Sequence, residues 1–504
     1  MTKQLQPHGA TDLGPVQLRT PGLRGTAQLL SRPAGPALLG AAAAEAPTGL
    51  PPRLAAALER SGVRQLHAVE VSNLRLDQPT LVAGPVTEPI QLMVRRPEPA
   101  AELAEETGMV ALSTDPQGVL RWHLGEPPDD AGHVAFSVPA TVDDGAGDGQ
   151  ALLGGLGRLL IHVLTFPIGQ IAGRLASRVI RDWEGGKRPP RVRPVTPDNY
   201  TTGFAGQMTA GDWSRLAGGR ALLWVHGTFS QTESGFGAMP RDTMAGLHAA
   251  YEGRMFGYDH PTVGFSPNEN VDTLLAICRA GLRSLPVDAL DLDIVCHSRG
   301  GLVSRLLTEQ ATAGQPLRVG KIVFVAAPNA GTQLCDTRYM GKLIDRYTNL
   351  LALVPNPVVD ALETVIELVK TVAVATVDRL PGLHAMCPAA HGGEFLAELN
   401  KAPQVSVPYF ALGSNYEPPA GIKAMIWGQD ELMDEVFRRD TVHGLEPVGN
   451  DLVVPTASVW DLGNGASFPV VQRESWDPDR SVNHSGFFTD SASMDRLSTW
   501  LTQS

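Results

Sequence analysis

The feature that most constrains the fold of this chain is an apolar run that leads into a serine and continues as a helix. Residues 292–307 read LDIVCHSRGGLVSRLL. A strand, a sharp turn and a helix in this order expose a nucleophilic serine, provided that the residues two positions away are small. Gly300 meets this requirement, and Cys296 is small although glycine is more usual there. Ser298 is therefore a candidate nucleophile, and the competing interpretation is an ordinary helix N-cap.

The chain from about residue 218 onward alternates apolar runs with helical segments. The strands that this pattern predicts lie at residues 221–225, 292–295, 321–325 and 407–412. Largely apolar runs that alternate with helical segments indicate a mostly parallel sheet covered by helices on both faces. We expect an α/β fold over residues 218–504, with a mostly parallel sheet and helices on both faces.

The N-terminal half has a different pattern, and 504 residues are enough for more than one domain. Residues 1–60 are rich in Pro, Gly and Ala, and we expect them to be loosely ordered. Residues 64–140 contain short alternating segments separated by Pro, Gly and Asp, which predict a small β-rich domain. The clearest of these segments are residues 66–71, 119–124 and 133–138.

Residues 141–217 are expected to link the two domains. An amphipathic helix packed on its own protein is predicted there by apolar residues at helical spacing: Leu152, Leu156, Leu159, Val163, Ile168, Ile171 and Leu175. A second interpretation is a helix in peripheral contact with a membrane, helped by Arg174, Arg178 and Arg181. Residues 187–191, KRPPR, look like an exposed basic linker.

Composition limits the partners and cofactors of the chain. A net charge of −12 and a pI near 5.6 argue against a general affinity for nucleic acid. The four cysteines contain no C-x-x-C pair, and no group of residues has the spacing of a metal site, so we expect neither a metal nor a cofactor. Because we see no apolar signal segment or membrane span, the expected location is the cytoplasm.

Four short patterns together resemble the lipase-like branch of the α/β-hydrolase superfamily, over residues 218–504. They are WVHGT at 224–228, CHSRGG at 296–301, AAPNAGT at 326–332 and NDLVVP at 450–455. The resemblance implies an α/β-hydrolase fold in which Ser298 is the nucleophile of a serine esterase or lipase. It also implies an oxyanion hole formed by the backbone N–H groups of Thr228 and Arg299, with a structural role for His226.

The order of the triad in this family, serine then acid then histidine, selects the other two catalytic candidates. Asp451 lies in a loop that resembles the family's N-D-G-x-V-P loop, with Leu452 in place of glycine; a plain Asx turn is its alternative. His484 is the only histidine after Asp451, so it is the expected general base. The weaker rivals are Asp434 and Asp461 as acids and, with an earlier acid, His443 as base.

Residues 335–400 have helical periodicity and occupy the place where lipases commonly carry a lid; an immobile helical layer is the alternative. Residues 259–261, Asp-His-Pro, are candidates to line the mouth of the site. The leading hypothesis is hydrolysis of carboxylic esters of lipids or other hydrophobic acyl compounds through an acyl-enzyme. An acyltransferase or amidase with the same triad, and a catalytically inactive interaction module, are the alternatives.

Overall fold

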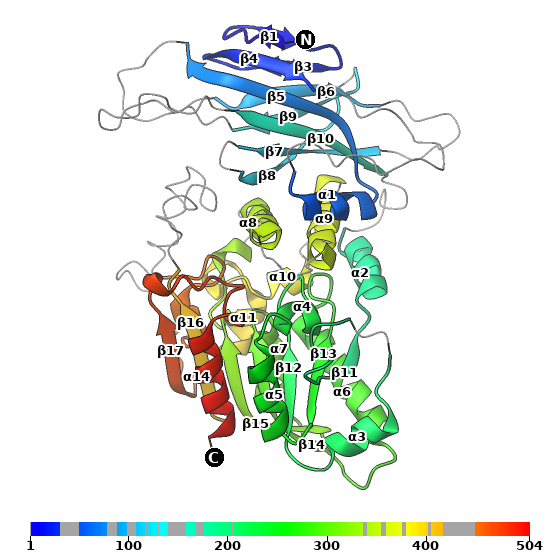
Figure 1. The fold of residues 1–504 in the computed structure, drawn as a ribbon, viewed down its shortest axis with the longest axis vertical. Coiled ribbons are helices and arrows are strands. Elements are labelled where there is room, and N and C mark those ends of the chain that lie inside the picture. Colours follow the sequence, from blue (N-terminus) through cyan, green and yellow to red (C-terminus); the bar gives the residue numbers. More distant parts are fainter. Residues whose placement is uncertain are drawn as a thin grey trace.

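The computed structural model of this protein shows two units stacked along its long axis, with helices between them (Figure 1). The upper unit in the figure consists of antiparallel strands, and the lower unit is a mostly parallel sheet with helices on both faces. The structure describes residues 2–30, 50–77, 88–97, 107–115, 118–129, 131–139, 158–167, 176–203, 206–335, 340–353, 359–374, 380–401, 405–416 and 449–503.

The N-terminal unit is a sandwich of two antiparallel sheets. The larger sheet has the order β1 (Thr2–Gln4), β4 (Leu23–Leu29), β5 (Arg64–Leu76), β10 (Leu159–Pro167), β7 (Thr107–Thr114) and β8 (Leu120–Leu124). The smaller sheet has the order β2 (Ala10–Asp12), β3 (Val16–Arg19), β6 (Ile90–Arg95) and β9 (His133–Val138). Apolar side chains of both sheets, such as Val69 and Phe136, meet in one core. The strands predicted within residues 64–140 lie in β5, β8 and β9.

The prediction of a loosely ordered N-terminal region is wrong for two stretches. Residues 2–29 contain β1 to β4, and residues 52–60 form the helix α1 (Pro52–Arg60). In β3, Val16 and Leu18 are buried while the residues between and after them are exposed, an alternation of only four residues. The surrounding sheet stabilises such short strands, so their own composition, rich in turn formers, does not reveal them.

The amphipathic helix predicted between residues 152 and 175 is wrong for the part that the structure describes. Residues 159–167 form β10, which is antiparallel to β5 on one side and to β7 on the other. Both faces of β10 are buried, because Ile161 packs in the sandwich core and Phe166 packs with the helices below. A short apolar run of this kind carries no period that separates a strand from a helix.

The peripheral membrane contact predicted for this region stays a prediction, because residues 168–175, which include Arg174, lie outside the described residues. β10 is an interior strand of its sheet, and Arg181 forms an ion pair with Glu269 at 2.7 Å. Within the described residues, no helix combines the length and the apolar character that are needed to cross a bilayer.

The C-terminal unit is built on a sheet with the order β11 (Arg191–Pro194), β13 (Met255–Asp259), β12 (Ala221–Val225), β14 (Leu290–His297), β15 (Leu317–Val325), β16 (Tyr409–Ser414) and β17 (Val470–Trp476). β11 is antiparallel to β13, and all the other neighbouring pairs are parallel. The strands predicted at residues 221–225, 292–295, 321–325 and 407–412 lie in β12, β14, β15 and β16. The predicted α/β fold class is therefore confirmed.

Helices cover both faces of this sheet (Figure 1). One face carries α3 (Ala210–Leu216), α6 (Pro267–Leu282) and α7 (Gly300–Glu309), and the other carries α4 (Thr232–Phe236), α5 (Arg241–Ala250) and α14 (Ser491–Thr502). In β12, Leu223 is buried with the first group of helices and Trp224 with the second. Successive side chains of a strand point to opposite faces, so a sheet covered on both sides requires an unbroken apolar run.

The unit begins earlier than the predicted boundary at residue 218. The residues predicted as an exposed basic linker are partly buried, because Arg188 lies inside and Arg191 pairs with Asp259 at 3.1 Å. The preceding helix, α2 (Ala176–Lys187), is held by Glu184, whose buried carboxylate accepts backbone N–H groups of residues 262–264 at 2.6 to 3.1 Å. A run of charges predicts exposure only when its members lack partners.

Two helices, α8 (Met340–Leu353) and α9 (Val359–Val374), lie between the sheet and the sandwich (Figure 1), and we call them the cover. α10 (Pro381–His384) and α11 (Glu394–Leu399) follow them, so the helices predicted within residues 335–400 are confirmed in the described part. α9 is attached to the N-terminal unit, since Arg60 pairs with Glu363 and Lys370 donates to the carbonyl of Ser61 at 3.1 Å.

Candidate active site

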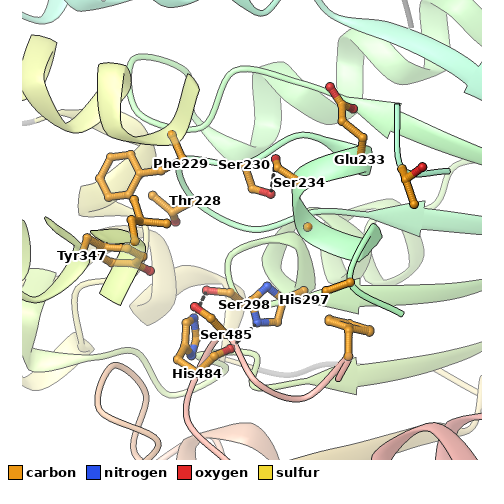
Figure 2. A pocket seen from close by; sticks show the side chains of 16 residues that line it. Thr228, Phe229, Ser230, Glu233, Ser234, His297, Ser298, Tyr347, His484 and Ser485 are labelled. Carbon is orange, nitrogen blue, oxygen red and sulfur yellow. Dashed lines mark hydrogen bonds between the residues drawn. The ribbon is translucent and has the colours of Figure 1, made fainter. Parts of the chain in front are cut away.

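Ser298 lies at the turn between β14 and α7 and has the unusual backbone angle φ of 51°. Its N–H donates to the carbonyl of Val325 on the neighbouring strand at 2.9 Å, and its carbonyl accepts from the N–H of Gly301 at 2.9 Å. A left-handed backbone costs about 1–2 kcal/mol for a residue with a Cβ, so the surrounding hydrogen bonds have to hold it in place. The turn directs the serine side chain into the cavity described below (Figure 2).

The small residues around this turn are explained by close backbone contacts. A Cβ on Gly300 would lie 2.4 Å from the carbonyl oxygen of Val225. Real Cβ atoms essentially never lie within 3.0 Å of such an atom, so only glycine fits at this position. A Cβ on Gly227 would lie 2.8 Å from the Cβ of Ser298. Cys296, the departure from the usual glycine, is accommodated because its side chain points into the core, with Sγ 3.5 Å from the carbonyl of Val323.

Ser298, His484 and Asp451 form a continuous chain of hydrogen bonds. The Nε2 atom of His484 lies 3.0 Å from Ser298 Oγ, and its Nδ1 atom lies 2.8 Å from Asp451 Oδ2. A carboxylate only accepts, so Nδ1 carries the proton and Nε2 is the acceptor for the serine hydroxyl. The three side chains that the sequence predicted are thus brought together, with the tautomer that a general base needs.

The loop that carries Asp451 is unusually constrained. Asp451 Oδ1 accepts the N–H groups of Val453 at 3.0 Å and Val454 at 2.8 Å, which leaves Oδ2 for the histidine. Leu452 has a φ of 88°, where glycine would be unstrained, and its carbonyl accepts from Arg346 of α8 at 2.7 Å. The side chain of Leu452 is fully buried, so packing offsets the strain at the position where the family has glycine.

His297 holds the backbone of His484, a role that the sequence analysis missed. His297 Nε2 donates to the carbonyl of His484 at 2.9 Å, while the N–H of His484 donates to the carbonyl of Asp451 at 2.9 Å. Burial lowers the pKa of His297 to about 3, so its ring is neutral at physiological pH. The position of His297 directly before Ser298 was the available signal.

Thr228 and Arg299, the predicted oxyanion residues, flank the serine. Thr228 lines the cavity with Ser298, and Arg299 is the residue that precedes the first turn of α7. The guanidinium of Arg299 is turned away into the protein, where it donates to the carbonyl of Gly382 at 2.9 Å and to Asn270 at 3.0 Å. Burial lowers the pKa of Arg299 to about 10, which still leaves it protonated. Its side chain therefore anchors α10 to α6.

The residues predicted to line the mouth of the site, 259–261, are buried beneath it instead. Asp259 accepts from the N–H of Thr232 at 2.9 Å and pairs with Arg191. His226 accepts the N–H of His260 at 3.1 Å and donates to the carbonyl of Gly227 at 2.9 Å, so its ring supports the loop from below. The prediction for residues 259–261 is wrong. The sequence at the end of a strand does not show whether other segments of the chain cover that end or leave it exposed.

A cavity of about 100 Å³ lies over Ser298 (Figure 2). The cover contributes Tyr347, Leu351 and Ala361 to its wall, and residues 228–238 contribute the opposite side, which includes Glu233. Burial raises the pKa of Glu233, and Arg193 pairs with it at 2.9 Å. The sequence analysis predicted an apolar cover but identified none of these wall residues, because each depends on how segments distant in the chain meet.

The rival residues from the sequence analysis do not join the cluster of Ser298, Asp451 and His484 in the described part of the chain. Asp461 is exposed and accepts the N–H of Gly463 at 2.7 Å, as an Asx turn does, while Asp434 and His443 lie outside the described residues. In the part of the chain that the structure describes, no three His, Cys, Asp or Glu residues gather as a metal site, and the cysteines form no disulfide.

Several solved structures resemble this chain. Lipase BlEst2 of Bacillus licheniformis in its mature form is 15% identical, with 56% of this chain and 92% of that chain covered and a TM-score of 0.37. Lipase 1 from Pelosinus fermentans is 13% identical over 56% and 99%, with a TM-score of 0.38. A metagenomic carboxyl esterase is 16% identical over 62% and 80%, with a TM-score of 0.30. No curated protein matches the sequence.

Two features define the α/β-hydrolase fold. The sheet has one antiparallel strand, β11, and β13 lies between β11 and β12. The serine lies at the turn between β14 and α7. Residues 187–502 match the family described as "Domain of unknown function (DUF7379)", and the chain belongs to this family. The matched region starts within the last residue of α2 and includes β11, in agreement with the early start of the C-terminal unit.

Proposed function

We propose that this protein is a serine hydrolase that cleaves carboxylic esters. The observation that carries the proposal is the hydrogen-bond chain from Ser298 Oγ to His484 Nε2 at 3.0 Å and from His484 Nδ1 to Asp451 Oδ2 at 2.8 Å. Only 1% of the surface of Ser298 is exposed, and the other two residues are also buried. Electrostatic interactions are stronger in such an environment than in water, which favours proton transfer from Ser298 to His484 next to the carboxylate of Asp451.

In the proposed reaction, Ser298 Oγ attacks the ester carbonyl carbon and its proton passes to His484 Nε2. The carbonyl electron pair moves to the oxygen, which accepts hydrogen bonds from the N–H groups of Thr228 and Arg299. When the pair returns, the alcohol leaves with the proton from His484, and Asp451 stabilises the imidazolium in the meantime. Water then attacks the acyl-enzyme by the same route and releases the acid.

The walls of the cavity favour a hydrophobic acyl group. Phe229, Leu351, Ala361 and Phe488 supply apolar surface close to Ser298. The volume of about 100 Å³ is below the roughly 300–1,000 Å³ of pockets that enclose drug-sized ligands. Short acyl esters therefore fit the site as it stands, and a lipid substrate requires the cover to move, which is the lid function proposed for residues 335–400.

Acyl transfer is the second candidate, and the burial of Ser298 favours it. A site from which water is largely excluded protects an acyl-enzyme until an acceptor alcohol or amine enters. Competition between water and added alcohol or amine during turnover separates the two activities. Formation of the transfer product in excess over the free acid indicates a transferase, and free acid alone indicates a hydrolase.

The test of the proposal is hydrolysis of p-nitrophenyl esters from acetate to palmitate by the wild type and by Ser298→Ala and His484→Ala. Each substitution is expected to reduce kcat on the order of 10⁶-fold, as for other serine triads. Ser493→Ala is the matched control, because Ser493 is equally buried but lies on α14, outside the cavity.

Labelling with a fluorophosphonate provides a second, substrate-independent measurement. Ser298 is expected to be labelled in the wild type and in Ser493→Ala, and Ser298→Ala is expected to take up no label. If the wild type hydrolyses no ester and Ser298 remains unlabelled, the hydrolase proposal fails. The interaction module is then the better account of the chain.

A further inference from the structure

The face of α8 that is turned toward the sheet brings a tyrosine hydroxyl to the nucleophile. Tyr347 lines the cavity together with Ser298 and His484, and its side chain extends from the cover toward them (Figure 2). Its hydroxyl end faces the part of the cavity wall that Ser298 and Thr228 form (Figure 2). These are the two residues between which the carbonyl oxygen of a substrate has to lie in the proposed reaction.

The ring of Tyr347 is held in this position from several sides. It packs edge-on against Phe229, with ring centroids 4.8 Å apart and an interplanar angle of 83°. The ring of His484 lies 6.4 Å away at 89°. Only 5% of the surface of Tyr347 is exposed, so its side chain has little room for another rotamer.

We propose that Tyr347 is a catalytic residue that donates a third hydrogen bond to the oxyanion, in addition to the backbone N–H groups of Thr228 and Arg299. The inference rests on the proposed function and adds a residue to it. As Ser298 Oγ bonds to the carbonyl carbon, its own proton goes to His484 and the negative charge forms on the carbonyl oxygen. Tyr347 keeps its proton throughout and donates a hydrogen bond to that oxygen.

The chemistry of Tyr347 suits a donor that stays protonated. Burial raises the pKa of its hydroxyl above the ordinary value, and the nearby carboxylate of Asp451 acts in the same direction. The hydroxyl is therefore neutral over the whole working range of a histidine base. It can supply a hydrogen bond to an anion without transferring the proton.

The opposite face of α8 explains how the tyrosine is positioned. β8 is the edge strand of the larger sandwich sheet, and α8 satisfies its outward backbone groups. The N–H of Leu120 donates to Asn349 Oδ1 and its carbonyl accepts from Asn349 Nδ2, both at 2.9 Å, and the N–H of Trp122 donates to Asp345 at 2.9 Å. One side of α8 thus carries Tyr347, the proposed donor to the oxyanion, and the other side is hydrogen-bonded to the N-terminal unit.

The opposing interpretation is that Tyr347 blocks the site. A hydroxyl beside Ser298 and Thr228 occupies space that a substrate carbonyl needs, and the cavity measures only about 100 Å³. The two interpretations predict opposite signs. Removal of a donor lowers kcat, whereas removal of a block raises kcat or lowers KM.

The experiment is Tyr347→Phe, which keeps the ring and removes only the hydroxyl, assayed with p-nitrophenyl acetate and butyrate. We expect kcat to fall about 10²-fold, the usual loss for one oxyanion donor, with KM little changed. Tyr251→Phe is the control, because Tyr251 is also 5% exposed but its hydroxyl donates to Asp293 at 2.8 Å, away from the cavity. An unchanged denaturation midpoint for Tyr347→Phe verifies that the fold is intact.

A trifluoromethyl ketone gives a readout that a purely structural role would not move. It forms a tetrahedral adduct with the serine, so its affinity for Tyr347→Phe is expected to fall by the same factor as kcat, while the affinity for the product acid stays constant. Equal kcat and equal adduct affinity in both proteins would refute the donor role, and so would a faster variant. If the wild type reacts with neither ester nor fluorophosphonate, the proposed function itself has failed.

Discussion

The C-terminal α/β unit and the N-terminal sandwich contribute to the site in different ways. Ser298, Asp451 and His484 all come from turns of the α/β unit that follow strands or precede helices. Among the described residues that line the cavity, none belongs to the sandwich. The sandwich contacts the cavity only indirectly. Its edge strand β8 is hydrogen-bonded to α8, and α8 places Tyr347 beside Ser298.

The difference between the two units lies in the range of their contacts. In the α/β unit, the turn at Ser298 is fixed by residues one strand away, and the acid loop is closed by hydrogen bonds to residues two and three positions on. The sandwich reaches the cover through pairs such as Leu120 and Asn349, which are 229 residues apart. The turn and the loop that carry Ser298 and Asp451 are therefore fixed mainly by nearby contacts, whereas the placement of α8 over the cavity depends on contacts between distant segments.

Beyond the two substitutions already described, the local side of this comparison is tested by Asp451→Asn. An amide no longer fixes the histidine tautomer or stabilises the imidazolium, and we expect kcat to fall about 10⁴-fold with KM nearly unchanged. The N–H groups of Val453 and Val454 keep an acceptor in the variant, so the loop is retained. Steady-state kinetics on p-nitrophenyl esters provides the measurement.

Asp461→Asn is the matched control for this substitution. Asp461 was the rival acid in the sequence, but it is exposed and binds only its own turn through the N–H of Gly463. We expect it to retain full activity. If Asp461→Asn lost most of its activity while Asp451→Asn kept a normal kcat, Asp461 would be the catalytic acid. The assignment of the acid to the loop of Asp451 would then be wrong.

The sequence predicted the parts of the site whose geometry is fixed by neighbours in the chain. The strand, turn and helix around Ser298 are recognisable because the small Gly300 and the apolar Leu292, Ile294 and Val295 are all within one segment. The order of acid and histidine along the chain then selected Asp451 and His484, and the structure brings their side chains together. Ser298 was identified from its own segment, and the other two from the order that the family resemblance implies.

The parts that could not be predicted depend on tertiary packing. β10 has no readable period because both its faces are buried, and the strands of residues 2–29 are too short to stand out. Tyr347 is one apolar-face residue among many on α8, and only the folded structure directs it to Ser298. His297 and Arg299 flank the serine in sequence, yet the partners of their side chains lie far along the chain.

The long-range half of the comparison is tested by Asn349→Ala. This substitution leaves the buried N–H and carbonyl of Leu120 without the side chain that satisfies both. We expect a loss of stability on the order of 3 kcal/mol, since each buried polar group left without a partner costs about 1–3 kcal/mol. Because α8 also carries Tyr347, kcat is expected to fall with stability, and guanidinium denaturation and ester kinetics measure the two effects.

Gln91→Ala is the control for the sandwich. Gln91 exchanges hydrogen bonds with Ser137 on the smaller sheet, and these bonds lie at the surface. We expect its stability to stay within about 0.5 kcal/mol of the wild type, as for most surface substitutions. If Asn349→Ala behaves in the same way as Gln91→Ala, the sandwich does not position the cover, and the two units act independently.

A pH dependence of stability is expected where α8 meets β8. Desolvation raises the pKa of Asp345 from its ordinary 3.8 to about 7, although the N–H of Trp122 and the charges of Arg121 and Lys342 act against it. Between about pH 4 and pH 7 the unfolded chain loses this proton while the folded chain retains it. The folded state binds more protons over that range, so this group makes the protein less stable as the pH rises.

Asp345→Asn removes this titration and keeps an oxygen that accepts from the N–H of Trp122. Relative to the wild type, the free energy of unfolding of the variant is expected to increase from about pH 4 to pH 7 and then to level off, because both states of the wild type are ionised above the folded pKa. Urea denaturation at several pH values measures the difference, with the exposed Asp288→Asn as control. A difference in the free energy of unfolding that is constant with pH would mean that Asp345 is ionised in the folded protein. Water would then reach the contact between α8 and β8. That contact would not be the desolvated junction that positions the cover over Ser298.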